Sequence, residues 1–96
     1  MMINRTDFLY RTRLDDATLE VWIAEEWLAP LRTEADMSFS EADLARAALI
    51  RELQHDIGVN REGVGVILSL LDQLHGLRRA LAGKLDRAAN ASTHDR

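Results

Sequence analysis

The feature that most constrains the fold is a long apolar stripe in the C-terminal half of the chain. Its members recur at the three- and four-residue steps that line one face of a helix: Val64, Ile67, Leu68, Leu71, Leu74, Leu77, Leu81 and Leu85. We therefore expect one long helix over residues 60–88, with Asn60 as its cap. The stretch from residue 61 to residue 88 would be about 42 Å long at ~1.5 Å per residue. A chain of 96 residues forms a single domain narrower than this, so part of the helix is expected to project.

A projecting row of leucines needs a cover, because burying each leucine contributes about 1.5–3 kcal/mol. We expect a second copy of the chain to provide it, which makes the protein a homodimer. The expected dimer interface consists of Leu71, Leu74, Leu77, Leu81 and Leu85. The alternative cover is the domain's own helices, reached if the chain folds back at Gly76. Residues 90–96 are polar and are expected to form a flexible tail.

Two short helices are expected near the N-terminus. Thr6 or Asp7 is placed to cap a helix over residues 6–13, and Asp15 to cap a second helix over residues 16–26. The inward face of the second helix is expected to hold Leu19, Trp22, Ile23 and Trp27. Together the two helices predict a helix-turn-helix unit.

A short connection and a third helix are expected to follow. Pro30 has no backbone N–H to donate and closes the second helix. Residues 31–39 are long enough only for a small hairpin or an irregular loop. Ser40 and Asp43 form a pattern similar to a capping box, so the third helix should begin there. Gly58 is placed to end it, because glycine accepts the left-handed conformation at helix ends.

Charge is distributed unevenly along the chain. The formal net charge is −4, but residues 1–48 carry ten acidic and five basic side chains, so the excess of acid lies in the first half. Five of the acids lie on or beside the expected second helix: Asp15, Asp16, Glu20, Glu25 and Glu26. No Lys or Arg occurs between Asp15 and Pro30. Such a helix repels the phosphates of nucleic acid, so we do not expect a nucleic-acid partner.

No pattern of catalytic or metal-binding residues emerges, and we do not expect an enzyme. His55, His75 and His94 are too far apart for the i, i+4 pair by which one helix face holds a metal ion. Acids are adjacent at 15–16 and at 25–26, and the two members of each pair would point about 100° apart on a helix. This arrangement suits helix capping or solvation better than acid–base catalysis. We therefore expect no metal and no cofactor.

The composition also bears on the compartment. The chain has no cysteine, which excludes disulfides and is compatible with a reducing environment. No apolar run approaches the ~18 residues needed to cross a membrane, and the first residues lack the apolar core of a signal peptide. We expect a cytoplasmic protein with no membrane partner.

Three short motifs in the first half are typical of a known family. They are Thr18-Leu19-Glu20-Val21-Trp22, Trp27-Leu28-Ala29-Pro30, and Phe39-Ser40-Glu41-Ala42-Asp43-Leu44-Ala45-Arg46. They resemble the DNA-binding domain of the MerR regulators, which typically reads T-L-R-Y-Y-E, L-L-x-P and Y-S-x-x-D-L at these positions. Where that family has a basic residue, this chain has Glu20, and Val21 and Glu26 replace the following tyrosine and a glycine. The scaffold is similar, whereas the charge on its second helix is reversed.

The second half narrows the resemblance. Its motifs are Leu53-Gln54-His55-Asp56-Ile57-Gly58-Val59-Asn60, Glu62-Gly63-Val64, and Leu70-Leu71-Asp72-Gln73-Leu74 with Leu77-Arg78-Arg79 behind. With the first half, they are similar over roughly residues 5–88 to the CbpM chaperone modulators, which pair a MerR-like fold with the signature D-L-G-V-N-x-x-G-[VI].

The expected fold class is mostly α. It is a single MerR-like domain over residues 1–96, with a helix-turn-helix and third helix over 5–58, a small wing-like segment and a long C-terminal helix.

The CbpM resemblance implies a protein partner. These proteins bind the J-domain of the DnaJ-like co-chaperone CbpA and restrain its action with DnaK. A J-domain recruits DnaK through a basic helix, which an acidic module would cover. The expected partner-binding residues are Glu20, Val21, Glu25, Glu26, Asp15 and Asp16, with Leu31 as a further apolar contact.

The alternative function is that of a MerR-type DNA-binding transcriptional regulator. It would use the same fold as a dimer and would contact backbone phosphates through Arg5, Arg11, Arg13, Arg32, Arg46 and Arg61. This alternative requires the acidic second helix to lie in the major groove, where charge repulsion opposes it.

Overall fold

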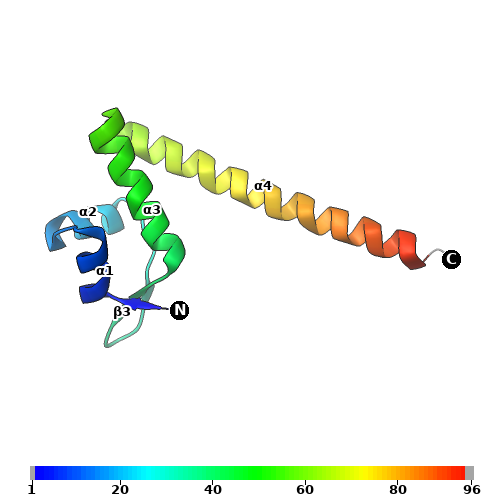
Figure 1. Ribbon diagram of the computed structural model, residues 1–96, viewed down its shortest axis with the longest axis horizontal. Helices are drawn as coiled ribbons and strands as arrows, with labels where there is room; N and C mark the ends of the chain where they lie inside the picture. The colour runs from blue at the N-terminus through cyan, green and yellow to red at the C-terminus, as the bar shows by residue number, and fades with distance from the viewer. Residues whose placement is uncertain (1, 95–96) are drawn as a thin grey trace. The chain divides into compact units, whose positions relative to one another are not determined.

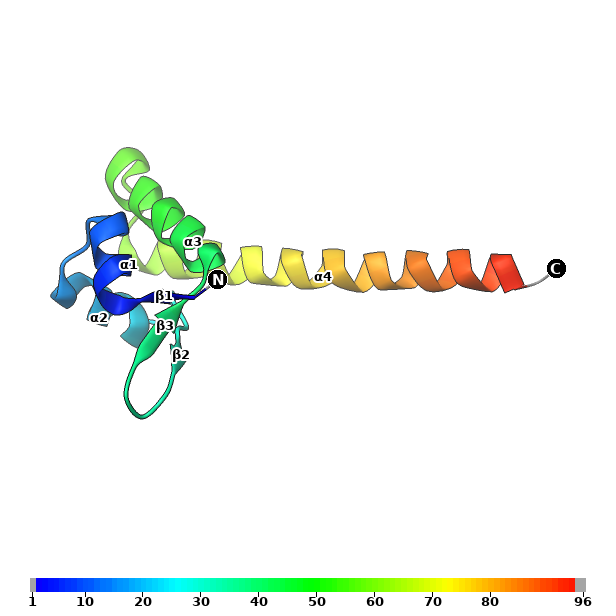
Figure 2. The same cartoon turned by 60° about the horizontal axis from the view of Figure 1, so that its bottom comes forward.

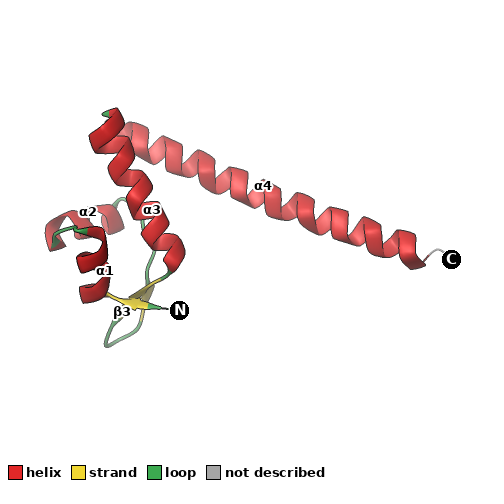
Figure 3. Cartoon of the chain, viewed as in Figure 1, coloured by secondary structure: helices red, strands yellow, loops and turns green. Residues whose placement is uncertain are grey.

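The computed structural model describes residues 2–94, with side chains through residue 91. Its elements, in chain order, are β1 (Ile3–Asn4), α1 (Arg5–Thr12), α2 (Asp16–Ala24), β2 (Leu31–Arg32), β3 (Met37–Phe39), α3 (Glu41–Arg51), the π-helical turn η1 (Glu52–Ile57) and α4 (Arg61–His94). Figure 3 shows that helix predominates, as the sequence predicts. The chain divides into two compact units, Met1–Gly65 and Val66–Arg96. That the two behave as one domain stays a prediction.

The expected helix-turn-helix consists of α1 and α2, joined by a short turn (Figure 1). Both helices begin at a side-chain cap. The Asp15 carboxylate accepts a hydrogen bond from the Thr18 amide at 2.7 Å, which confirms the predicted cap of α2. The prediction for α1 is wrong, because Asn4 rather than Thr6 or Asp7 is its cap, and the Asn4 side chain accepts from the Asp7 amide at 2.7 Å.

The second helix is shorter than expected. It ends at Ala24 instead of residue 26, because Glu26 adopts a left-handed backbone conformation, with φ at +63°, that a right-handed helix cannot continue. Pro30 therefore lies beyond the helix end. Trp27 also lies beyond it but is still buried, and its ring contacts that of Trp22 with 6.2 Å between centroids.

Three short strands form an antiparallel sheet in the order β1-β3-β2. β2 and β3 make a hairpin, so residues 31–39 form the hairpin and not the irregular loop (Figure 2). The strand β1 is an addition that the sequence did not predict. It pairs Ile3 with Phe39, which connects the start of α1 to the hairpin.

The core of the first unit is centred on two stacked phenylalanines. Phe8 of α1 and Phe39 of β3 are fully buried, with ring centroids 4.0 Å apart and ring planes at 10°. Around them lie the other buried apolar residues of this unit: Ile3, Leu19, Trp22, Trp27, Leu28, Ala47, Ile50, Leu53 and Val64. These residues come from the sheet and from every helix, so a single core fixes which face of α2 is exposed.

The third helix begins as predicted. The Ser40 hydroxyl accepts from the Asp43 amide at 3.1 Å, and the Asp43 carboxylate accepts from the Ser40 amide at 2.8 Å, which is a complete capping box. α3 then passes into η1, a wider turn that the sequence did not indicate. Gly58 ends η1 with φ at +81°, which confirms the predicted stop.

The last helix, α4, is longer than predicted. Asn60 is its cap, because the Gly63 amide donates to the Asn60 side chain at 2.8 Å. The helix continues past residue 88 to His94, so most of the predicted tail is helical, and residues 95 and 96 lie outside the described part of the chain. α4 is unbroken at Gly76 (Figure 1), so the chain does not fold back there.

The second unit consists of the remainder of α4 and carries an exposed apolar stripe. Four of its predicted interface leucines are exposed in the single chain, whereas Leu71 is half-buried: Leu74 40%, Leu77 69%, Leu81 58% and Leu85 61%. Leu70, which was not in the predicted set, is 59% exposed and lies four residues before Leu74. The exposed stripe, defined as Leu70, Leu74, Leu77, Leu81 and Leu85, therefore begins one residue earlier than predicted.

Candidate functional site

The candidate site is the exposed face of α2, where the six predicted partner-binding residues lie on or next to one short helix. Asp15 has a local structural role, because it caps the helix through the Thr18 amide. This hydrogen bond lowers the pKa of Asp15 below its ordinary value. The capping contribution is therefore present at neutral pH and is lost as the pH falls through this lowered pKa.

Two of the acids are paired with an arginine from the start of α1. Arg5 lies 2.9 Å from the Asp16 carboxylate and 2.9 Å from the Glu20 carboxylate. The hydrogen bonds to Asp16 and then to Glu20 raise the pKa of Arg5. The side chain of Arg5 is only 29% exposed, whereas its two partners are 73% and 57% exposed, so both carboxylates remain open to solvent.

The C-terminal end of α2 has a similar pair. Glu25, the C-cap residue, forms an ion pair with Arg61, the first residue of α4. Glu26 follows in its left-handed conformation, and among the described residues its side chain forms no hydrogen bond or ion pair. The acidic helix is thus partly neutralised at both ends by arginines distant in the sequence.

These pairs leave the face acidic. Two arginines offset five carboxylates, and ion pairs between exposed side chains contribute only about 0–1 kcal/mol, so a cationic partner can compete with them. Val21 is 42% exposed and lies on the same helix as these acids. Leu31, the first residue of β2, is 61% exposed. The α2 face, defined as Asp15, Asp16, Glu20, Val21, Glu25 and Glu26, combines negative charge with an exposed apolar side chain.

Sequence reasoning found these acids but missed the cations that pair with them. Arg5 is 11 residues from Asp16, and Arg61 is 36 residues from Glu25. No local pattern connects residues so far apart, and only the packing of the first unit brings them together.

The arginines that a DNA-binding function would use are largely engaged within the chain. Arg5 and Arg61 pair with acids of α2, and Arg46 donates a hydrogen bond to the Trp27 carbonyl. Arg11 lies 3.2 Å from the Asp7 carboxylate one helical turn away. No Lys or Arg is contributed by α2 itself.

Metal and membrane features are also absent from the part of the chain that the structure describes. It contains no group of three or more acidic or histidine side chains placed to hold a metal ion. Of the three histidines, the side chain of His94 lies outside the described residues. Among residues 2–94, no helix has both the length and the hydropathy required to cross a bilayer.

Comparison with known proteins identifies one family. A family model described as MerR HTH family regulatory protein matches residues 3–83. The match covers the sheet, the helix-turn-helix, α3, η1 and most of α4. No curated protein and no solved structure matches the chain.

Proposed function

The chain belongs to the family of MerR helix-turn-helix regulatory proteins, and from that premise we propose that its α2 face binds the J-domain of a CbpA-like co-chaperone. Binding there would prevent the co-chaperone from cooperating with DnaK. The protein then acts as a chaperone modulator, in the cytoplasm with its partner, and it catalyses no reaction and needs no cofactor. The resemblance of residues 5–88 to the CbpM proteins supports this specific partner.

One observation supports the proposal most strongly. In a helix-turn-helix that reads DNA, the second helix enters the major groove, between two rows of phosphates. Here that helix carries acids at Asp16 and Glu20, with Glu25 at its end, and no Lys or Arg. A surface of this charge is complementary to a basic protein helix. Complementary charge accelerates encounter and selects the partner, while exposed Val21 supplies apolar burial.

The proposal includes a homodimer formed through the exposed stripe of α4. The stripe repeats at four- and three-residue steps from Leu70 to Leu81, which is the spacing of a coiled-coil seam. A second copy brings an identical stripe, so the two faces are self-complementary.

The charge on α2 provides the mutational test. We expect the double substitution Glu20→Lys and Glu25→Lys to weaken binding to an isolated J-domain roughly 10- to 100-fold, because both reversals place cations against a basic surface. The measurement is the Kd by calorimetry, with thermal unfolding as a check, because both substitutions also disrupt ion pairs with Arg5 and Arg61.

A matched control carries the same change in net charge away from α2. Glu34→Lys with Asp86→Lys alters two exposed acids, one in the hairpin turn and one on α4. This control should bind the J-domain nearly as the native chain does. Equal affinity of the Glu20/Glu25 variant and the native chain would place the interface elsewhere.

DNA binding is the second candidate, supported by the family's description as regulatory proteins. The two candidate functions predict different results in a mobility-shift experiment on random duplex DNA at low salt. We expect no shift, because the charge on α2 opposes contact with phosphates. Appreciable binding to the duplex would favour the regulator.

A further inference from the structure

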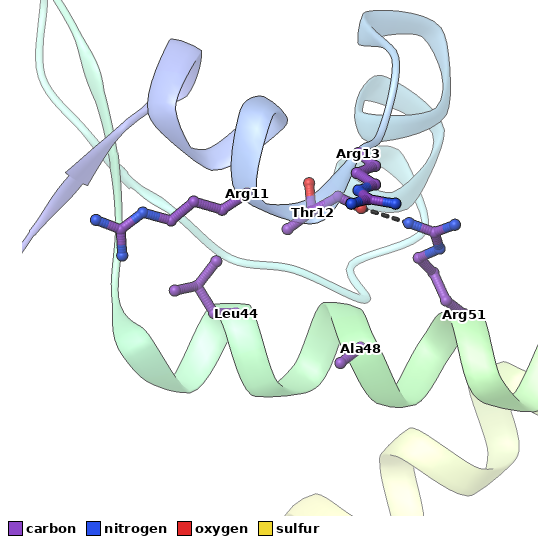
Figure 4. Close-up of a pocket in the computed structure, with 6 residues that line it drawn as sticks. All are labelled: Arg11, Thr12, Arg13, Leu44, Ala48 and Arg51. Carbon is purple, nitrogen blue, oxygen red and sulfur yellow. Dashed lines mark hydrogen bonds between the residues drawn. The ribbon is translucent and has the colours of Figure 1, made fainter.

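A second surface of the first unit has a pocket with three arginines in its lining. A pocket of about 360 Å³ lies between the end of α1 and α3, and its lining consists of Arg11, Thr12, Arg13, Leu44, Ala48 and Arg51 (Figure 4). Half of these residues are arginines and none is acidic. The lining itself is basic, and acids lie only beside it: Asp15 lines a neighbouring pocket with Arg13, and Glu52 and Asp56 line another with Arg51.

Arg13 is in an unusual position for an arginine. It is the C-cap of α1 and has a left-handed backbone, with φ at +58°, a conformation that favours glycine. Among the described residues, its side chain makes no hydrogen bond or ion pair. The side chain therefore gives the fold no hydrogen bond or ion pair that would offset the strain of its backbone. Strained residues of this kind cluster at functional sites.

Arg51 lies at the same pocket and is held in place. Its guanidinium donates to the Thr12 carbonyl at the end of α1, as the dashed line in Figure 4 marks. A guanidinium has five N–H donors, so this hydrogen bond leaves others available. The Thr12 hydroxyl is already used, because it donates to the Phe8 carbonyl at 2.7 Å.

Arg11 contributes less to the pocket. Its guanidinium lies 3.2 Å from the Asp7 carboxylate, and in Figure 4 its side chain extends away from those of Arg13 and Arg51. Leu44 and Ala48, one turn apart on α3, form the apolar part of the lining. The pocket thus combines two available cations with an apolar wall.

We propose that Arg13 and Arg51 form a binding site for the phosphate group of a small phosphomonoester. The planar fork of a guanidinium matches the oxygens of a phosphate, and two such cations match the charge of a phosphate dianion. The wall formed by Leu44 and Ala48 contacts the organic part of the ligand. A phosphodiester of nucleic acid carries a single charge per phosphate and is matched less well. This site is separate from the α2 face and does not depend on the proposed J-domain function.

The test is a titration of the ¹⁵N-labelled full chain, followed by NMR at constant ionic strength. Phenyl phosphate and inorganic phosphate are the probes. We expect shifts confined to residues near 11–13 and 44–51, and tighter binding of phenyl phosphate than of inorganic phosphate because only the former contacts the apolar wall. Shifts that map elsewhere, or equal binding of the two probes, would overturn the proposal.

One substitution separates a binding role of Arg13 from a structural one. Arg13→Gly removes the guanidinium but suits the left-handed backbone, so the Tm should rise while phenyl phosphate binds about tenfold more weakly or worse. Arg32→Gly, at an exposed arginine outside the pocket, is the charge-matched control and should bind as the native chain does. Unchanged binding by Arg13→Gly contradicts the proposal. The proposal is also contradicted if the Arg13→Gly substitution weakens the binding of duplex DNA but not that of phenyl phosphate.

Discussion

The double variant Leu77→Glu and Leu81→Glu is expected to sediment as a monomer under conditions in which the native chain sediments as a dimer. Leu77 and Leu81 are 69% and 58% exposed in the single chain. A symmetric dimer buries both leucines of each copy, and burial of each contributes about 1.5–3 kcal/mol, so the variant loses roughly 6–12 kcal/mol of association free energy. Four introduced carboxylates would also face one another. Analytical ultracentrifugation over a concentration series measures the effect.

The control for this variant introduces the same charges on a different side of the helix. His75→Glu with Ala82→Glu changes two exposed positions of α4 outside the exposed stripe. Because neither residue belongs to the seam, this control should remain a dimer. If the native chain is a monomer even at high concentration, the proposed dimer does not exist, whatever the variants do.

The second large effect is on stability. We expect Phe39→Ala to lower the free energy of unfolding by about 3–5 kcal/mol, because it removes a fully buried ring stacked on Phe8 and leaves a cavity. Small domains have roughly 5–15 kcal/mol in total, so the variant would be largely destabilised. Urea denaturation followed by tryptophan fluorescence reports the change, because Trp22 and Trp27 lie in the same unit.

Tyr10→Ala is the matched control for Phe39→Ala. Tyr10 lies on α1, as Phe8 does, but its side chain is 83% exposed. Its loss should change the free energy of unfolding by no more than about 0.5 kcal/mol. A Phe39→Ala variant as stable as Tyr10→Ala would contradict the core described above.

Local signals in the sequence predicted the helix starts that depend on nearby residues. The cap at Asp15 and the capping box of Ser40 with Asp43 each act over three residues, and both are present. The cap of α1 was missed because three neighbouring polar side chains competed for it, and the formation of β1 places the helix start at Arg5. Helix-capping propensity alone does not determine which of several neighbouring polar residues becomes the cap.

Long-range features could not be predicted from the pattern. The pairing of Ile3 with Phe39 connects the strand before α1 to the hairpin strand before α3, and nothing in either segment specifies the other. The acids of the α2 face were identified from the distribution of charge along the sequence, whereas the Arg5 and Arg61 pairs that partly neutralise them follow from tertiary packing. On α4, the periodicity identified most of the exposed stripe, but it did not distinguish exposed Leu70 from half-buried Leu71, because both fit a helical repeat.

We propose that an acidic helix on a MerR-type scaffold binds a basic protein surface. Calorimetric titration of the native chain with an isolated J-domain from the same organism, at low and at raised ionic strength, tests it most directly. We expect binding with a Kd on the order of micromolar or below at low salt, weakening as salt screens the charges. The absence of any heat of binding at low ionic strength would contradict the account.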